Sequence, residues 1–140
     1  WVLIFSYPEN SHTEDYRQEV LNLVNAQRAK YGLTALEMGD DNLTAAAQTR
    51  AEEIAVVNSH VRPDGSKCFT VLKDYGVTDT PTGENAAWGS VSPEEVVNAW
   101  MNSEGHRANI LNPEARKMSV GYYYNSNSTW GHQWIQIFTK

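Results

Sequence analysis

The sequence predicts an α+β fold, and two patterns along the chain support this prediction. Through most of the chain, apolar residues recur at intervals of three and four, which is typical of amphipathic helices. After the last proline the period changes to two, as in a β-strand. The alternating residues there are Met118, Val120, Tyr122 and Tyr124. A turn-rich segment at 125–128 and a second alternating stretch over 130–138 complete a β-hairpin. Helices followed by a hairpin indicate helices stacked on an antiparallel sheet.

Two long helices are expected in the first half of the chain. The first covers about residues 13–31, follows a polar loop over 8–14, and ends at Gly32. Its apolar face consists of Tyr16, Val20, Leu23, Val24 and Tyr31. An extended link then leads to a second helix over about 42–58, capped by Asp40 or Asp41. Its buried stripe is predicted to be Leu43, Ala46, Ala47, Arg50, Ile54 and Val57.

The middle of the chain predicts shorter elements. A turn over 63–65 places His60 between a helix end and a tight turn. We expect a short helix over 69–75, a loop over 77–83 and a short strand over 84–89.

The best-marked helix covers 92–102. Ser92 is a natural N-cap, Pro93 suits the first helical position, and Glu95 completes a capping box. Beyond it, the segment 105–113 is expected to be a loop that Arg107 and Asn109 tie to the backbone.

Length and charge limit the classes of function. The 140 residues fit one domain over 13–140, with residues 1–12 as a lead-in or the remainder of an upstream segment. The net charge of −6 argues against nucleic acid, and no apolar run is long enough for a transmembrane helix. We expect a monomer. The single cysteine excludes an internal disulfide, and we interpret Cys68 as a small buried apolar residue.

Glu84 and His106 stand out as candidate site residues. They lie at opposite ends of the capped helix, and each has a neighbouring glycine that allows close approach of the backbone. A carboxylate and an imidazole positioned by one rigid element are typical of a functional site.

Several motifs, in order, resemble the CAP superfamily: the SCP domain of cysteine-rich secretory proteins, antigen 5 and pathogenesis-related proteins. The chain is most similar to the bacterial secreted branch, over about residues 16–138. The motifs are Asn25-Ala-Gln-Arg28, Ser59-His60, Arg62-Pro-Asp-Gly65, Gly83-Glu84-Asn85, Trp100-Met-Asn-Ser103, Gly105-His106-Arg107 and Trp134-Ile-Gln136-Ile-Phe138. The resemblance implies an α-β-α sandwich, with helices packed on both sides of a central antiparallel sheet, and a central cleft.

The resemblance also implies a site in that cleft, where the family places two histidines and two glutamates. His60 and His106 match the histidines, and Glu84 matches the first glutamate. Ser103 stands at the position of the second glutamate. Glu104 is next to Ser103, but one residue turns a helix by about 100°, so its side chain is expected to point in another direction. We place Asn85, Ser103 and Glu104 around the site as supporting residues.

Three interpretations of this cluster remain open. His60 and His106 are candidate ligands of a divalent metal such as zinc, with Glu84 as the general base of a hydrolase. Alternatively, the cluster is a hydrogen-bonded device that stabilises the surrounding loops. A triad of Ser103, His106 and Glu84 is less favoured because no nucleophile-elbow motif surrounds Ser103, which we interpret as a local cap.

Three classes of function follow. The first, which we favour, is a secreted or cell-surface binding module for a small hydrophobic molecule, a peptide or a glycan. The second is a metal-dependent, peptidase-like hydrolase that uses His60, Glu84 and His106. The third is a structural domain of an envelope or spore. The serine at position 103 favours the first and third, so we expect a protein that is not an enzyme.

Overall fold

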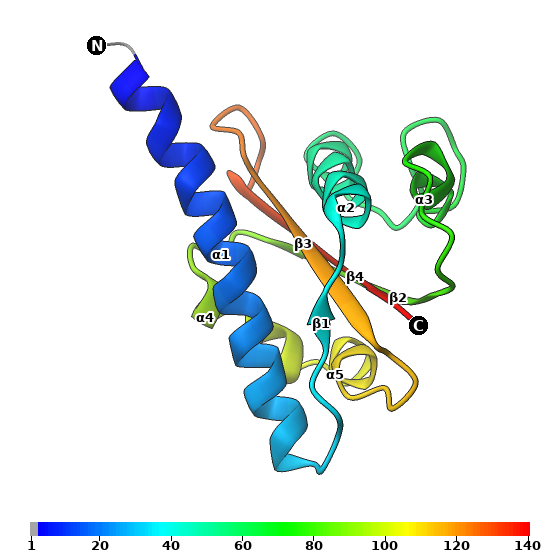
Figure 1. The fold of residues 1–140 in the computed structure, drawn as a ribbon. Coiled ribbons are helices and arrows are strands. Elements are labelled where there is room, and N and C mark those ends of the chain that lie inside the picture. The colour runs from blue at the N-terminus through cyan, green and yellow to red at the C-terminus, as the bar shows by residue number, and fades with distance from the viewer. Residues whose placement is uncertain (1–2) are drawn as a thin grey trace.

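The fold is described from a computed structural model that covers the backbone of residues 3–140 and the side chains of residues 15–140 (Figure 1). The elements are α1 (Leu3–Lys30), β1 (Glu37–Met38), α2 (Asp41–Ile54), α3 (Thr70–Asp74), β2 (Pro81–Trp88), α4 (Pro93–Met101), α5 (Glu104–Ile110), β3 (Lys117–Tyr124) and β4 (His132–Thr139). Helices and a sheet alternate in three layers, which confirms the predicted α+β sandwich. No helix in the part of the chain that is described is both long and apolar enough to cross a membrane.

The four strands form one sheet in the order β1-β3-β4-β2. β3 and β4 make the predicted hairpin, and β2 pairs antiparallel with the other edge of β4. The two-residue β1 pairs in parallel with the start of β3. The sheet is therefore mixed, which corrects the expectation of a wholly antiparallel one. The reason is that the link after α1 runs along β3 in the same direction before α2 begins.

Two hydrophobic cores lie on opposite faces of this sheet. α1, α4 and α5 cover one face, and α2 and α3 cover the other (Figure 1). β4 serves both cores, because Trp134 and Phe138 point into the first while Ile135 and Ile137 point into the second. The alternation of side chains along a strand explains this division.

Local signals account for the helix starts in the middle of the chain. The side chain of Asp40 accepts a hydrogen bond from the Leu43 amide at 3.0 Å and caps α2. Ser92 caps α4 in the same way through the Glu95 amide at 3.1 Å, with Pro93 at the first helical position. Both caps were predicted from the sequence.

Several expectations about the edges of elements were wrong. α1 begins at Leu3, so the backbone of residues 8–14 is helical where a polar loop was expected. Tyr31 and Val57 are exposed because α1 and α2 end before them. Trp130 is also exposed, in the turn that precedes β4. His12, which the sequence indicates to be an ordinary exposed side chain of the lead-in, lies outside the residues whose side chains are described.

The segment after α4 was also predicted wrongly. Residues expected as a loop over 105–113 instead begin with the short helix α5. The expected loop over 77–83 gives way to β2 at Pro81. A glycine lies in each segment, Gly105 in the first and Gly83 in the second, and it weakens the sequence signal for a helix or a strand. Tertiary contacts stabilise both elements.

Close packing of α2 on β3 requires a glycine at position 121. A Cβ atom there would lie 2.1 Å from the carbonyl oxygen of Ala47 in α2. Gln48 fastens the same contact, since its amide donates to the Tyr122 carbonyl at 2.8 Å and accepts from the Tyr122 amide at 3.0 Å. The side chain of Gln48 in α2 therefore binds backbone groups of β3 directly.

We expect Gly121→Ala to lower the free energy of unfolding by about 1–3 kcal/mol, because the methyl group would push α2 off the sheet. Urea denaturation measures this loss. Gly105→Ala is the matched control: a Cβ there meets nothing within 4 Å, so helix propensity predicts no loss or a gain of up to about 1 kcal/mol. Equal losses in both variants would contradict the packing argument.

Candidate functional site

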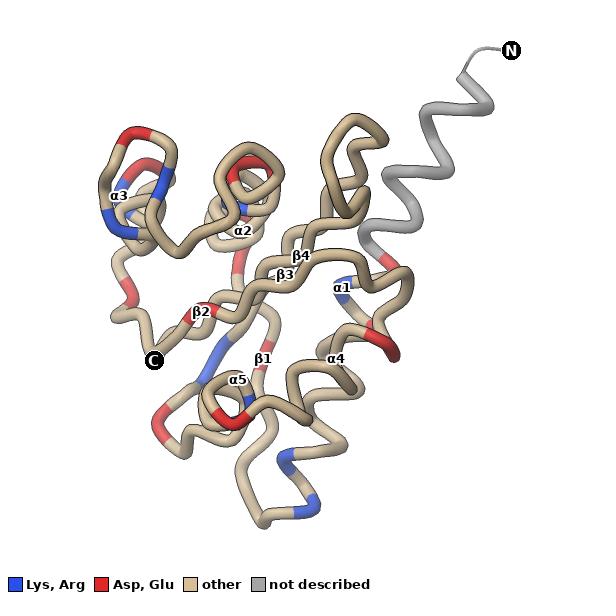
Figure 2. The backbone as a smooth tube through the Cα atoms, turned by 180° about the vertical axis from the view of Figure 1, so that it is seen from behind, with Lys and Arg blue, Asp and Glu red and all other residues tan. Residues whose placement is uncertain are grey.

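The candidate site forms where α2, β2, α5 and the loop after α2 meet. Glu84 and Asn85 come from the middle of β2, and His106 comes from α5. His60 lies in the loop between α2 and α3. Arg50, from the buried face of α2, completes the group on the face of the sheet opposite α5, as Figure 1 and Figure 2 both show for these two helices.

Glu84 and Arg50 form a buried bidentate ion pair. Arg50 donates from Nε to Glu84 Oε2 at 2.9 Å and from Nη2 to Oε1 at 3.1 Å. The Arg50 side chain is fully buried and that of Glu84 is 1 % exposed. Burial lowers the Arg50 pKa, but the hydrogen bonds and the charge of Glu84 outweigh this effect and raise it. A fork-shaped guanidinium on a carboxylate is the strongest form of such a pair.

His60 binds the same carboxylate from the solvent side. Its Nδ1 lies 2.8 Å from Glu84 Oε1, while its side chain remains 58 % exposed. Arg50 also fixes the backbone of this loop, because Nη2 donates to the carbonyl of Ser59 at 3.0 Å. The predicted proximity of His60 and Glu84 is therefore present in the structure.

A second arginine extends the charged network to α3. Arg62 binds both carboxylate oxygens of Glu53 and also Asp74, while Glu53 accepts from Arg50 Nη1 at 3.0 Å. The hydrogen bond with Glu53 is the main cause that raises the Arg62 pKa. The loop that carries His60 is thus held at both ends.

His106 lies on the other side of β2 and does not touch Glu84 by any hydrogen bond within the described residues. Its Nδ1 lies 2.8 Å from Ser103 Oγ. Burial, followed by the nearby charge of His60, lowers the His106 pKa. The triad of Ser103, His106 and Glu84 is therefore not assembled, because the carboxylate is engaged by His60 and Arg50.

Amide side chains fasten α5 to β2. Asn85 is fully buried and donates to the His106 carbonyl at 3.1 Å. Asn109 donates a hydrogen bond to Asn85 Oδ1 at 2.9 Å. Asn109 therefore anchors this segment, as predicted, although the segment is a helix and not a loop. Ser103 stands at the N-cap of α5 but makes no capping bond; its hydroxyl holds His106 instead. Glu104 is exposed on the first turn.

Cys68 is the residue that sequence reasoning left out of the site. It is buried, as predicted, but ligand atoms of His60, Cys68 and Glu84 all lie within 4.8 Å of one another. Burial and then the charge of Glu84 raise the pKa of the Cys68 thiol to about 11. A thiol must lose its proton to bind a metal, so this environment disfavours Cys68 as a ligand.

His60 and His106 are the predicted metal ligands, whereas the group of three ligand atoms that lies close together in the described part of the chain is that of His60, Cys68 and Glu84. Neighbours hold the Nδ1 atom of each ring, and no hydrogen bond within the described residues uses Nε2 of His60 or His106. In metal sites, a hydrogen-bond partner at one ring nitrogen of a histidine likewise orients the other ring nitrogen towards the metal. Two nitrogens are fewer than the three protein ligands of catalytic zinc sites, so they fit a weakly held ion.

The geometry can now be compared with known proteins. Residues 21–138 match the Cysteine-rich secretory protein family, or CAP. The chain belongs to this family.

Two proteins of Bacillus subtilis are similar to this CAP domain. It is 41 % identical over 127 residues to the uncharacterized protein YkwD of Bacillus subtilis, covering 89 % of this chain and 49 % of that protein. It is 33 % identical over 115 residues to the uncharacterized membrane protein YlbC of the same organism, covering 79 % and 33 %. The chain thus spans half or less of each of these relatives.

Two solved structures share the fold and part of the sequence. An extracellular SCP-domain protein of Bacillus anthracis matches with a TM-score of 0.79 and 25 % identity, over 91 % of this chain and 41 % of that chain. An outer surface protein of Borrelia burgdorferi matches with a TM-score of 0.69 and 26 % identity, over 86 % and 88 %. These matches confirm the resemblance that the sequence motifs indicate.

We expect Glu84→Gln to lower the free energy of unfolding by about 3 kcal/mol, because it breaks the buried bidentate ion pair and leaves the partly exposed Glu53 as the charged partner of Arg50. Chemical denaturation at neutral pH measures the loss. Glu114→Gln is the control, since Glu114 pairs with Lys140 at the surface and such pairs contribute about 1 kcal/mol or less. A loss below about 1 kcal/mol for Glu84→Gln would show that the ion pair is dispensable.

The His106 pKa predicts a dependence of stability on pH. Because folding lowers this pKa from 6.5, the unfolded chain takes up a proton first as the pH falls. The His106 contribution is therefore complete above about pH 7 and is lost as the pH falls through 6.5 towards the folded value. Denaturation of wild type and His106→Asn at about pH 7.5 and 5.5 tests this, and the variant should lose less stability on acidification. Parallel pH profiles would contradict the assignment.

Proposed function

We propose that this CAP domain acts outside the cell as a binding module, and that His60 and His106 form its contact surface for a ligand. One observation carries the proposal: the Glu84 carboxylate is buried and occupied by Arg50 and His60. In this arrangement Glu84 orients the site and does not act on a substrate. The extracellular and outer-surface relatives support the location.

The geometry at Glu84 disfavours a hydrolase. A general base must lie within hydrogen-bond reach of a substrate proton or of a water, and its lone pairs must be available. The Glu84 side chain is 1 % exposed, and Arg50 and His60 bind its oxygens. A substrate therefore has little access to the carboxylate, and protonation would weaken its buried ion pair with Arg50.

The exposed faces of the two imidazoles are suited to binding. Each Nε2 can accept or donate a hydrogen bond according to tautomer, so polar groups of a peptide or a glycan match the surface. A zinc ion would be held by His60 and His106 and would supply a Lewis acid there. Peptide, glycan and small hydrophobic ligands remain the classes that the proposal covers.

Zinc titration by calorimetry on the wild type and on His60→Ala/His106→Ala tests the proposal. We expect zinc to bind more weakly than micromolar, since two imidazoles supply only part of a catalytic ligand set. Peptide and ester substrates should not be turned over with or without zinc. His132→Ala is the control, because this imidazole binds Tyr122 outside the cluster.

The following result would contradict the proposal. Sub-micromolar zinc binding that the double substitution removes, together with hydrolysis that depends on His60, would replace the binding module by a metal-dependent hydrolase. A folded double variant, verified by circular dichroism, is required for that conclusion.

A further inference from the structure

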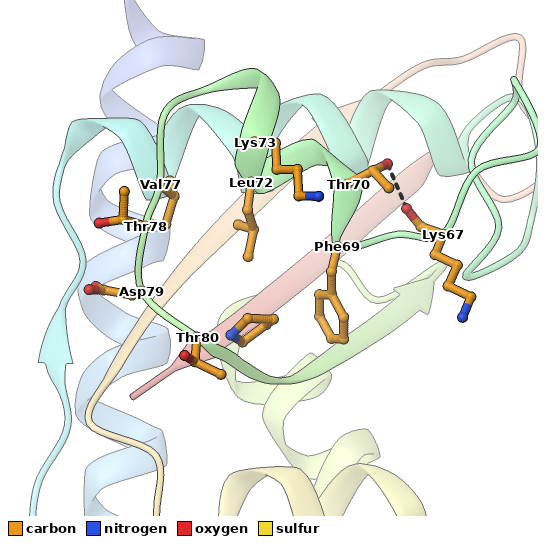
Figure 3. Close-up of a pocket in the computed structure, with 10 residues that line it drawn as sticks. Lys67, Phe69, Thr70, Leu72, Lys73, Val77, Thr78, Asp79 and Thr80 are labelled. Atoms are coloured by element: carbon orange, nitrogen blue, oxygen red, sulfur yellow. Dashed lines mark hydrogen bonds between the residues drawn. The ribbon is translucent and has the colours of Figure 1, made fainter.

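The hairpin of β3 and β4 differs in charge from the rest of the chain. Charged residues make up 20 % of the sequence, but no Lys, Arg, Asp or Glu occurs from Met118 to Thr139. Figure 2 shows the turn of this hairpin without the blue or red of charged residues. The hollow between α3 and the start of β2 is different, because Lys67, Lys73 and Asp79 line it (Figure 3). The hairpin turn thus has no acid, lysine or arginine that would attract an ionic partner.

Two large aromatic side chains are exposed at this turn. Tyr124, the last residue of β3, is 54 % exposed, and Trp130 is 57 % exposed. A Cβ atom at Gly131 would lie 3.2 Å from the Tyr124 ring, and one at Gly89, just after β2, would lie 3.8 Å from the Trp130 ring. The Gly89 amide donates to the His132 carbonyl at 2.8 Å. Both aromatic rings therefore lie at the same end of the sheet.

A row of aromatic rings supports Tyr124 from below. The ring centroid of the buried Trp134 lies 4.5 Å from that of Tyr122. His132 follows at 5.9 Å from Tyr122, and Tyr124 lies 4.9 Å from His132. The Tyr122 hydroxyl also lies 2.6 Å from His132 Nδ1. Because this row extends from the core to the surface, the exposed ring is held in place and loses little conformational entropy on binding.

Uncharged polar groups lie between the two exposed rings along the chain. The Ser128 hydroxyl donates to the Asn125 carbonyl at 2.8 Å and fixes the backbone of the turn. Ser126, Asn127 and Thr129 are exposed. Their hydroxyl and amide groups can both donate and accept hydrogen bonds. The turn therefore combines flat apolar faces with neutral hydrogen-bonding groups.

We propose that residues 124–130, here called the hairpin platform, bind a neutral glycan whose sugar rings stack on Tyr124 and Trp130. A sugar ring has a flat face of C–H groups and an edge of hydroxyl groups. It therefore matches an aromatic face that lies beside uncharged hydrogen-bonding groups. The platform does not depend on the histidine cluster, since it lies beyond the end of β2 whereas Glu84 lies in the middle of that strand.

A lipid surface matches the hairpin platform less well. Proteins that lie on membranes combine aromatic residues with Lys or Arg, which attract anionic lipids. The platform has neither cation, and the chain has a net charge of −6. Insertion would also remove water from Ser126, Asn127 and Thr129, which costs free energy unless they find new partners. Sugar hydroxyls supply such partners.

NMR titration of the isotope-labelled domain with chitotetraose and with cellotetraose tests the platform. Chemical shifts should move at residues 122–132, including the indole N–H of Trp130, and not at His60 or His106. Shifts with both oligosaccharides would assign the contact to the sugar ring, and shifts with chitotetraose alone would assign it to N-acetylated glycans. Neutral phosphatidylcholine vesicles should move none of these signals.

Substitutions at the two rings separate stacking from other contacts. Trp130→Ala and Tyr124→Ala should each lose at least about tenfold in affinity, as central aromatic residues of binding sites do. Tyr124→Phe keeps the ring and should stay within about twofold of the wild type. Tyr31→Ala is the matched control, because Tyr31 is 61 % exposed at the end of α1, away from the hairpin turn (Figure 1). It should bind as the wild type does.

Three results would overturn the proposal: no shifts at residues 122–132 with millimolar oligosaccharide, unchanged affinity in both alanine variants of the platform, or an equal loss in Tyr31→Ala. Shifts at these residues with vesicles and not with oligosaccharides would replace the glycan by a lipid surface. Because zinc reports on His60 and His106, failure at the hairpin platform leaves the proposed function of the histidine cluster untouched. The converse also holds.

Discussion

The buried pair of Arg50 and Glu84 is the interaction on which the rest of the site depends. It joins the inner face of α2 to the middle of β2 across the second core, and the same guanidinium holds the carbonyl of Ser59. The His60 loop, the edge strand β2 and a core helix therefore meet at one cation. Because both partners are desolvated, removing either one breaks a buried ion pair, although Arg50 also pairs with Glu53. This constraint makes Glu84 an anchor for its neighbours.

The parts of the fold that follow from local chemistry could be predicted from the sequence. Asp40 and Ser92 mark helix starts because a side-chain oxygen satisfies a free amide, and this signal lies within a few residues. The hairpin of β3 and β4 follows from alternation in the same way. α5 has no comparable signal: Gly105 weakens its propensity, and Asn85 and Asn109 supply its stability through contacts with β2.

Only part of the candidate site could be predicted from the sequence, because some of its contacts join residues that are far apart along the chain. Glu84 and His106 were found from their positions around the capped helix, the resemblance to the family added His60, and the structure brings His60 and Glu84 into contact. The role of Arg50 was missed, although an arginine in an apolar helical stripe indicates a buried counter-ion. Its partner lies 34 positions further along the chain, so no local pattern could identify it. Cys68 was missed because a small buried side chain carries no periodic signal.

The surroundings of Cys68 have a consequence for the redox chemistry of the domain. Thiolate is the species that exchanges with disulfides, and a pKa of about 11 leaves only about one part in ten thousand ionised at neutral pH. The sulfur is also shielded, since the residue is 9 % exposed. Burial, followed by the charge of the carboxylate that Arg50 holds in place, therefore keeps this unpaired cysteine in its protonated form, which does not exchange with disulfides.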